Sequence, residues 1–370
     1  MQITEVEVRC CRRETPSISA DSLRQSSAGG ELEFLVVTLH TDAGITASSF
    51  GFAGRSARGS GELAAAAMRP FLTGRNPLDR EAIWQDFLVE DRWWNHLPIY
   101  SFGPFDICLW VLGALDAGQP LYRYIGGFRD TIETYVSSLV LPSPEAYGQE
   151  ALEAKNKGYR AYKVHPPGTN VGEVIDIHRA VRAAVGDDFP LMSDPVGTLP
   201  FDETLLLGRE LERLGYVWLE EPFLDENISA LKELTRRLDI PIIGGEVLKR
   251  HPYSAAQLLG DRIVDHVRAD VSWSGGVTGV MKTARLAEAF HANCEIHSSI
   301  LHPLELVNLH CCGAVANNRY FELLYPTDTF AFGLKQPLPI ENGIARLPQE
   351  PGLGIDFDWD LIDNCTTAEV

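Results

Sequence analysis

Three carboxylates recur in the sequence at a regular spacing. Asp194 and Glu220 are separated by 26 residues, and the same interval leads on to Glu246. Each follows a short apolar run, in MSDP, WLEEP and GGEV. Hard oxygen ligands with no cysteine nearby suit Mg²⁺, which prefers octahedral oxygen coordination. The spacing therefore predicts a magnesium site, and the alternative is that each carboxylate only caps the helix after it.

Glu220 is followed directly by Glu221, so one of the two must be chosen as the ligand. Successive side chains of a strand point to opposite faces. Glu220 is nearer the strand, and we take it as the ligand. Glu221 is then expected to have a supporting or structural role.

Two further pairs of polar residues have the chemistry to move protons. Asp270 and His297 end neighbouring predicted strands, an arrangement in which a carboxylate orients an imidazole and supports its protonated form. Lys163 and His165 lie two residues apart on one predicted strand and so point to the same face. We expect His297 to be a general base or acid beside the Lys163 and His165 pair. The alternatives are a structural histidine and a solvated charged pair.

Eight short apolar or β-branched runs must position these side chains. They alternate with helical stretches, as parallel βα units do. The runs cover 132–139, 161–166, 190–195, 217–222, 241–247, 266–271, 293–299 and 320–324. Eight such units in about 200 residues predict a TIM barrel, with its active site at the carboxyl ends of the strands. A doubly wound sheet is the competing architecture, but no Gly-rich phosphate turn lies between a strand and a helix of the repeat.

The residues before the barrel have an α+β pattern, with strands expected over 3–10 and 32–40 and helices over 62–72, 77–88 and 104–117. We expect a first domain over 1–125, the barrel over 126–334, and a return segment over 335–370 that packs on the first domain.

Two Ser- and Gly-rich segments of the first domain, 16–30 and 51–61, have the composition of mobile lids. They carry Arg24, Arg55 and Arg58, which could bind a distal carboxylate of the substrate or be solvated surface residues. Trp93 and Trp94 are expected either to line the pocket or to belong to the core.

The overall composition narrows the class of partner. The chain has 370 residues, 51 acidic against 32 basic, and a net charge of −19, which disfavours nucleic acid and membrane surfaces. Seven cysteines without a CxxC argue against a disulfide framework and a thiolate zinc site. No run is long enough to span a bilayer, and the N-terminus lacks a signal-peptide pattern. We expect a cytoplasmic globular protein that acts on a small molecule.

Taken together, the motifs resemble the enolase superfamily, and within it the mandelate racemase subgroup of acid-sugar dehydratases and racemases. The resemblance covers nearly the whole chain and rests on GYRAYKVHPPG, MSDP, WLEEP, GGEV, the Asp before SGGVTG, EIHSS and YFELL. It implies an α+β capping domain over a modified (β/α)₇β barrel, Mg²⁺ held by Asp194, Glu220 and Glu246, and a homo-oligomer. The step it implies is abstraction of the proton α to a carboxylate, giving a metal-stabilised enediolate, with a Lys or His base.

One residue departs from the pattern of the subgroup. His165 stands where a lysine base is usual. A lysine pKa of about 10.4 must be lowered for base chemistry near neutrality, whereas a histidine pKa starts near 6.5. We expect Lys163 and the metal to disfavour the imidazolium, so that His165 serves as base or acid, or only hydrogen-bonds the substrate.

The leading expectation is dehydration of a sugar acid to a 2-keto-3-deoxy acid. The substrate carboxylate and 2-hydroxyl would bind Mg²⁺, which with Lys163 would stabilise the enediolate charge. His297, oriented by Asp270, would take the α-proton or protonate the departing 3-hydroxyl. By the resemblance, Glu322 would hydrogen-bond a carboxylate oxygen. The alternatives are a racemase or epimerase with His165 and His297 as paired bases, a cycloisomerase, and a binding relic without turnover.

Overall fold

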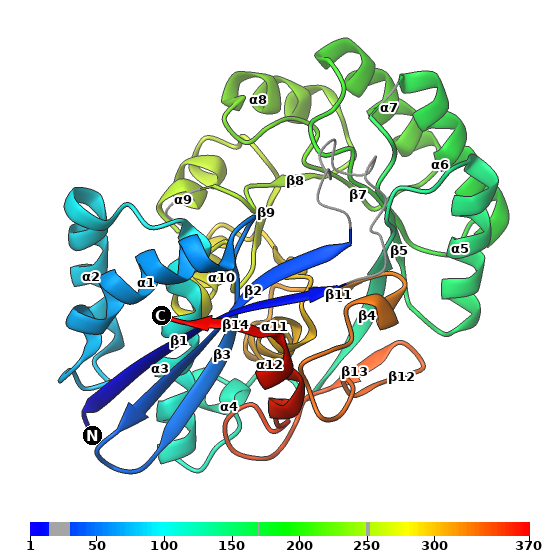
Figure 1. Cartoon of the computed structure of the whole chain (residues 1–370). Coiled ribbons are helices and arrows are strands. Elements are labelled where there is room, and N and C mark those ends of the chain that lie inside the picture. The colour runs from blue at the N-terminus through cyan, green and yellow to red at the C-terminus, as the bar shows by residue number, and fades with distance from the viewer. Residues whose placement is uncertain (15–29, 169, 249–251) are drawn as a thin grey trace.

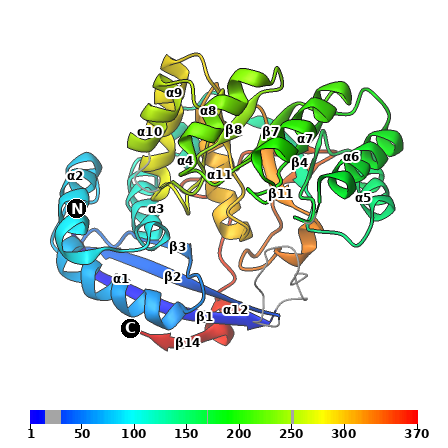
Figure 2. The same ribbon diagram turned by 90° about the horizontal axis from the view of Figure 1, so that it is seen from above.

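The computed structural model describes residues 1–14, 30–168, 170–248 and 252–370. An antiparallel sheet with its helices lies beside a parallel barrel whose helices form an outer ring (Figure 1). Seen from above, the two parts form separate layers (Figure 2). The predicted fold class, a modified TIM barrel with an α+β capping domain, is confirmed.

The capping sheet has the strand order β14-β1-β2-β3. Its strands are β1 (Ile3–Glu14), β2 (Glu31–Thr41), β3 (Thr46–Phe52) and β14 (Thr366–Glu369). The apolar side chains of β2 and β3 make the core on which the helices pack, and Phe34 and Phe50 stack with their ring centroids 5.2 Å apart. The helices are α1 (Ala57–Leu72), α2 (Arg80–Glu90), the π-helix η2 (Asp91–Asn95), α3 (Ile99–Asp116) and α4 (Leu121–Ile125).

The barrel is built from parallel strands joined by helices. Its strands are β4 (Thr131–Ser137), β5 (Tyr162–Val164), β6 (Leu191–Ser193), β7 (Trp218–Glu220), β8 (Ile242–Gly244), β9 (His266–Ala269), β10 (Cys294–Ile296) and β11 (Phe321–Leu324). The connecting helices are α5 (Pro144–Asn156), α6 (Val171–Val185), α7 (Phe201–Arg213), α8 (Ile228–Arg237), α9 (Tyr253–Gly260), α10 (Gly276–Ala289) and α11 (His302–Ala314). Each strand is shorter than its predicted run, so several of the predicted site residues lie just beyond a strand.

The barrel closes through strand pairing at β4 and through bonds to two asparagines between β10 and β11. β4 pairs in parallel with both β5 and β11. Between β10 and β11 the connection uses asparagines: Asn317 accepts a bond from the Cys294 N–H at its carbonyl, and the Asn318 side chain accepts one from Ile296. These bonds join β10 to the residues just before β11.

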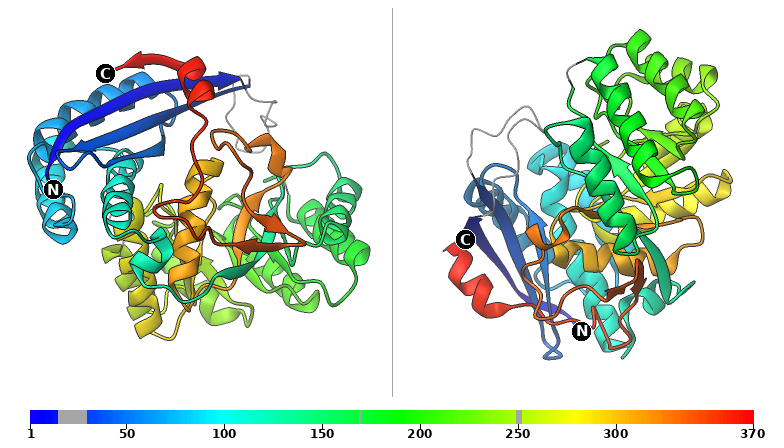
Figure 3. Two further views of the ribbon diagram at one scale, coloured as in Figure 1. Left: turned by 90° about the horizontal axis from the view of Figure 1, so that it is seen from below. Right: turned by 90° about the vertical axis from the view of Figure 1, so that its right-hand side faces the viewer.

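The residues after β11 return to the capping sheet. They form the 3₁₀ helix η3 (Thr327–Thr329), the hairpin β12 (Ile340–Glu341) and β13 (Ile344–Arg346), and helix α12 (Trp359–Cys365). β13 pairs with β4, and β14 then pairs with β1. Both ends of the chain lie at the capping sheet (Figure 3). The exact domain boundaries stay predictions.

Two glycines allow the capping domain to approach the loop that follows β9. A Cβ at Gly103 of α3 would lie 2.6 Å from the Val271 carbonyl oxygen. Gly276, at φ +88°, leaves room for Asp106, where a Cβ would lie 2.5 Å from Oδ2. Asp106 accepts bonds from the Thr278 N–H and hydroxyl at 2.8 and 2.6 Å. The contact therefore ties α3 to the segment that begins at the end of β9.

Among the described residues, α3 is the helix with the length and apolar composition to cross a membrane, but most of it is buried inside the protein, as in a core helix.

The structure corrects one expectation about the capping domain and narrows another. Residues 57–61 begin α1, because the Ser56 side chain caps that helix by accepting the Gly59 N–H. Trp93 and Trp94 are 63% and 79% exposed on η2, so they do not belong to the core, and their contact with the pocket stays a prediction.

Candidate active site

The polar residues predicted at the strand ends gather at one end of the barrel. Lys163 and Glu220 lie on β5 and β7, whereas Asp194 and Asp270 come directly after β6 and β9. The arrangement follows from parallel strands whose carboxyl ends lie level around a barrel.

Lys163 lies at the centre of this group and is fully buried. Its Nζ is 2.6 Å from Glu220 Oε1, 2.8 Å from Glu322 Oε1 and 3.4 Å from Asp194 Oδ2. Burial opposes the charge of Lys163, but Glu220 and Glu322 outweigh it and hold the pKa of the ammonium well above its usual value. Lys163 is therefore a fixed positive charge inside the barrel.

Arg268 is a second buried cation, which the sequence analysis did not single out. It lies on β9, and its Nη2 is 3.1 Å from Glu220 Oε1 and also pairs with Glu322 Oε2. A signal was present: Arg268 is two residues before Asp270, so the two side chains share a face of the strand. Although burial would raise the pKa of Glu322, Lys163 and Arg268 hold it well below its usual range.

His165 contacts acceptors with both ring nitrogens. Nδ1 donates to the Ser138 carbonyl at 2.6 Å, and Nε2 is 2.9 Å from Asp194 Oδ2. Burial and Lys163 lower the pKa of His165, but Asp194 outweighs them and raises it. The expectation that Lys163 and a bound metal together disfavour the imidazolium stays a prediction.

The predicted pair of Asp270 and His297 is brought together. His297 Nδ1 is 3.1 Å from Asp270 Oδ2, and Asp270 Oδ1 accepts the Ser272 and Trp273 N–H groups. His297 Nε2 is 3.4 Å from Glu246 Oε2. Burial opposes the charge of His297, but Glu246 and Asp270 raise its pKa to about 9. This imidazole is thus oriented by one carboxylate and charged with the help of another.

A divalent cation fits the carboxylates at this end of the barrel. Within the part of the chain that the structure describes, Glu246 Oε2 and Glu221 Oε1 are buried and have no hydrogen-bond partner. Burial raises the pKa of Glu246 to about 7, with Glu220 and Asp194 adding to the rise and His297 opposing it. Burial and Glu246 likewise raise the pKa of Glu221 well above its usual value. These carboxylates repel one another, and a hard cation that binds their oxygens would relieve the repulsion.

The choice between Glu220 and Glu221 as ligand is still a prediction. Both Glu220 oxygens have partners, Oε1 in Lys163 and Arg268 and Oε2 in the indole N–H of Trp218 at 2.9 Å. Glu221, at φ +38°, is buried with one free oxygen. The sequence assigned Glu221 a supporting role, and the structure makes it a second candidate.

The three capping-domain arginines were predicted to bind a distal carboxylate of the substrate. Arg24 lies outside the described residues. Arg55 is exposed, and Arg58 is exposed on α1 and pairs with Glu62 of the same helix at 2.9 Å. Their contact with a substrate stays a prediction.

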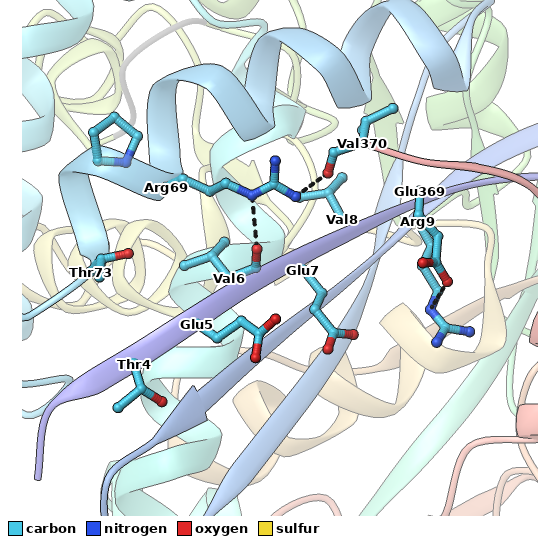
Figure 4. Close-up of a pocket in the computed structure, with 11 residues that line it drawn as sticks. Thr4, Glu5, Val6, Glu7, Val8, Arg9, Arg69, Thr73, Glu369 and Val370 are labelled. Atoms are coloured by element: carbon cyan, nitrogen blue, oxygen red, sulfur yellow. Dashed lines mark hydrogen bonds and ion pairs between the residues drawn. The ribbon is translucent and has the colours of Figure 1, made fainter.

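A cavity of about 610 Å³ lies elsewhere, between β1, the end of α1 and the last residues of the chain (Figure 4). Arg69 reaches across it, donates to the Val6 carbonyl at 3.0 Å and bonds the Val370 oxygen. Its polar groups serve the capping sheet, so we place the candidate active site in the barrel.

Comparisons with known proteins agree with this geometry. The model of the Enolase C-terminal domain-like family matches residues 146–361. A crystal structure of D-glucarate dehydratase from Agrobacterium tumefaciens complexed with magnesium has a TM-score of 0.88 and 32% identity, covering 100% of both chains. Arabinonate dehydratase of Saccharolobus solfataricus is 29% identical over 263 residues, 70% of each chain. The 3,6-anhydro-alpha-L-galactonate cycloisomerase of Streptomyces coelicolor is 27% identical over 356 residues, 92% of this chain and 94% of that protein.

The fold and the cluster at its carboxyl end define a barrel of the enolase type with a capping domain. The family match covers more than half of the chain. The protein belongs to the Enolase C-terminal domain-like family, in the mandelate racemase subgroup of the enolase superfamily, as its motifs predicted.

Proposed function

We propose that this protein is a Mg²⁺-dependent sugar-acid dehydratase that converts an aldonate or aldarate to a 2-keto-3-deoxy acid. The observation that carries the proposal is the Asp270 and His297 pair, 3.1 Å apart, beside the buried carboxylates and Lys163. The dehydratase names of its relatives support the same reaction class.

Asp194, Glu220 and Glu246 are the residues that would hold the cation. When bound, Mg²⁺ supplies positive charge that makes the proton α to the substrate carboxylate more acidic. Lys163 adds a fixed charge at the same end, where negative charge develops as that proton leaves.

His297 moves a proton in this scheme. Its Nδ1 is held by Asp270, so Nε2 is the atom that takes the α-proton or protonates the departing 3-hydroxyl. His165, directly after β5, is the second proton-transfer group. Loss of the α-proton and the 3-hydroxyl releases water and leaves an enol, which becomes the 2-keto acid.

Glu322 was expected to hydrogen-bond the substrate carboxylate. Both its oxygens accept bonds from the protein in this structure, Oε1 from Lys163 at 2.8 Å and Oε2 from the Ser298 N–H at 3.2 Å. Its contact with substrate stays a prediction. Cytoplasmic localisation and a homo-oligomer also stay predictions.

A second function is favoured by the two histidines. His165 and His297 come from different strands, and two bases on one carbon permit racemisation or epimerisation. Because one relative is a cycloisomerase, a further alternative is cycloisomerisation, in which an internal ring oxygen of the substrate would leave in place of water.

The test is a screen for 2-keto acid formation. Protein loaded with Mg²⁺ is incubated with aldonates and aldarates, and keto product is trapped with semicarbazide and read by absorbance. We expect product from one or a few substrates and none after EDTA treatment. Product formation that persists without divalent cation would contradict the metal-dependent scheme.

A further inference from the structure

Four buried side chains form a closed ring of alternating charge across the barrel. Lys163 contacts Glu220 and Glu322, and Arg268 contacts the same two carboxylates from the other side. The four come from β5, β7, β9 and β11, and all are at most 1% exposed. The sequence motifs assign no role to Arg268.

We propose that Arg268 is a positioning residue for the reaction proposed above, acting through Glu220 and Glu322 on Lys163. The inference rests on the proposed function for its effect on turnover. Its structural part, that Arg268 fixes the two carboxylates, stands on the ring alone.

The geometry of the guanidinium argues against a purely packing role. Among the described residues, Arg268 Nε and Nη1 are buried with no hydrogen-bond partner, and the nearest carboxylate to Nε is Glu246 Oε2 at 3.8 Å. A buried charge with unmet donors is costly, and apolar residues of similar size often replace buried ion pairs without loss of stability. A side chain that only filled the barrel would not need this charge.

The contacts that Arg268 shares between the two carboxylates explain its proposed role. One Nη2 contacts both carboxylates, so each carboxylate has two cationic partners on different strands. Without Arg268, Lys163 would be the one cation of the ring between Glu220 and Glu322. A single ammonium would then have to balance the charge of two buried carboxylates. At least one carboxylate would then shift, and Lys163 would lose a contact that holds its Nζ.

The experiment compares R268M and R268K with the wild-type protein. In crystal structures we expect R268M to show Glu220 or Glu322 displaced from its present contacts with Lys163. In kinetics we expect kcat to fall about 100-fold, because a displacement of about 1 Å can cost this much, while KM changes little. R268K should recover most of kcat, because a single nitrogen makes both contacts and an ammonium can take its place.

Arg182 provides the matched control. It is a buried arginine on α6 that donates to the Leu214 and Phe189 carbonyls, away from the site. R182M should lower the stability of the fold but leave the kcat of folded protein unchanged.

Two results would overturn the proposal: unmoved Glu220 and Glu322 in R268M, or equal kcat in R268M and R268K. Should R268M fail to fold, R268Q replaces it under the same criteria. If no sugar acid is turned over by the wild-type protein, the proposed function fails, and the crystal structures still decide the role of Arg268.

Discussion

At the scale of single residues, the chemistry depends on how each charge is held. His297 has Asp270 at one ring nitrogen and Glu246 near the other. Lys163 and Glu322 are fixed by the ring described above. The imidazole is therefore the group whose protonation can change, and the ring supplies constant charge beside it.

We predict that His297→Asn lowers kcat by about 10²- to 10⁴-fold, the usual contribution of a positioned acid or base. An amide can keep the hydrogen bond to Asp270 but cannot carry the proton. Turnover is measured with the substrate found in the screen. Mg²⁺ affinity by titration calorimetry is the control and should not fall, because the substitution removes a positive charge near Glu246. Turnover near the wild-type rate would remove His297 from the proton transfer.

The metal ligands make a separate prediction. Glu246→Gln and Glu220→Gln should weaken Mg²⁺ binding by more than the about 10- to 100-fold typical of residues outside the coordination sphere, and Glu221→Gln should stay within that range. Calorimetric titration of each folded variant checks this. A larger loss in Glu221→Gln than in Glu220→Gln would make Glu221 the ligand.

Much of the site was predictable from single residues and their spacing. The 26-residue interval placed Asp194, Glu220 and Glu246 on successive strands, and Asp270 with His297 on adjacent ones. Arg268 was missed because its spacing from Asp270 indicates only a shared face of the strand, while its partners Glu220 and Glu322 lie 48 and 54 residues away. Only the closed barrel brings those strands together.

At the scale of elements, the close contact between α3 and the loop after β9 positions the site. Gly103 lets the helix approach Val271, the residue next to Asp270. Any side chain at position 103 must push α3 and the loop after β9 apart.

Gly103→Ala should therefore reduce the free energy of unfolding by about 1–3 kcal/mol, as overpacking does, and should also lower kcat. Denaturant unfolding and turnover measure the two effects. Gly260→Ala is the control, since a Cβ there meets nothing within 4 Å. Equal effects of the two substitutions would show that the close approach is unimportant.

The sequence predicted the order of the elements better than their ends. Strand–helix alternation indicated the barrel, but most predicted runs extended past their strands, because the residues that follow each strand stay buried although they no longer pair in the sheet. The start of α1 was hidden for a similar reason: Ser56 and the glycines after it have the composition of a loop, while Ser56 in fact caps the helix.

At the scale of the whole molecule, three histidines outside the site are buried in neutral form. Burial lowers the pKa of His178, His302 and His310 to about 4. Below pH 6.5 the unfolded chain takes up protons that the folded protein does not. Protonation of these histidines therefore does not oppose folding above pH 6.5, and it favours the unfolded chain increasingly as the pH falls towards 4.

We predict that the free energy of unfolding falls by about 1.4 kcal/mol per pH unit for each of these histidines over that range. Urea unfolding at a series of pH values measures the slope. His310→Gln can keep a bond to the Leu353 carbonyl. It should reduce the slope of unfolding free energy against pH by the amount that one histidine contributes. An unchanged slope in the variant would contradict the assignment.

The closure of the barrel and the return of the chain to β1 were only partly predictable. A return segment was expected, but β14 pairs with β1 through a register that no local pattern encodes. The bonds from β10 to the Asn317 carbonyl and the Asn318 side chain likewise form only in the closed fold.

The central claim is that this site removes a proton α to a carboxylate and then eliminates the 3-hydroxyl. Proton NMR of Mg²⁺-loaded protein in D₂O with the aldonate and aldarate panel tests it most directly. We predict loss of the C2 proton together with the 3-hydroxyl, and a new C3 methylene that carries solvent deuterium. Deuterium at C2 without elimination, or an unchanged C2 proton across the panel in protein that binds Mg²⁺, would contradict the claim.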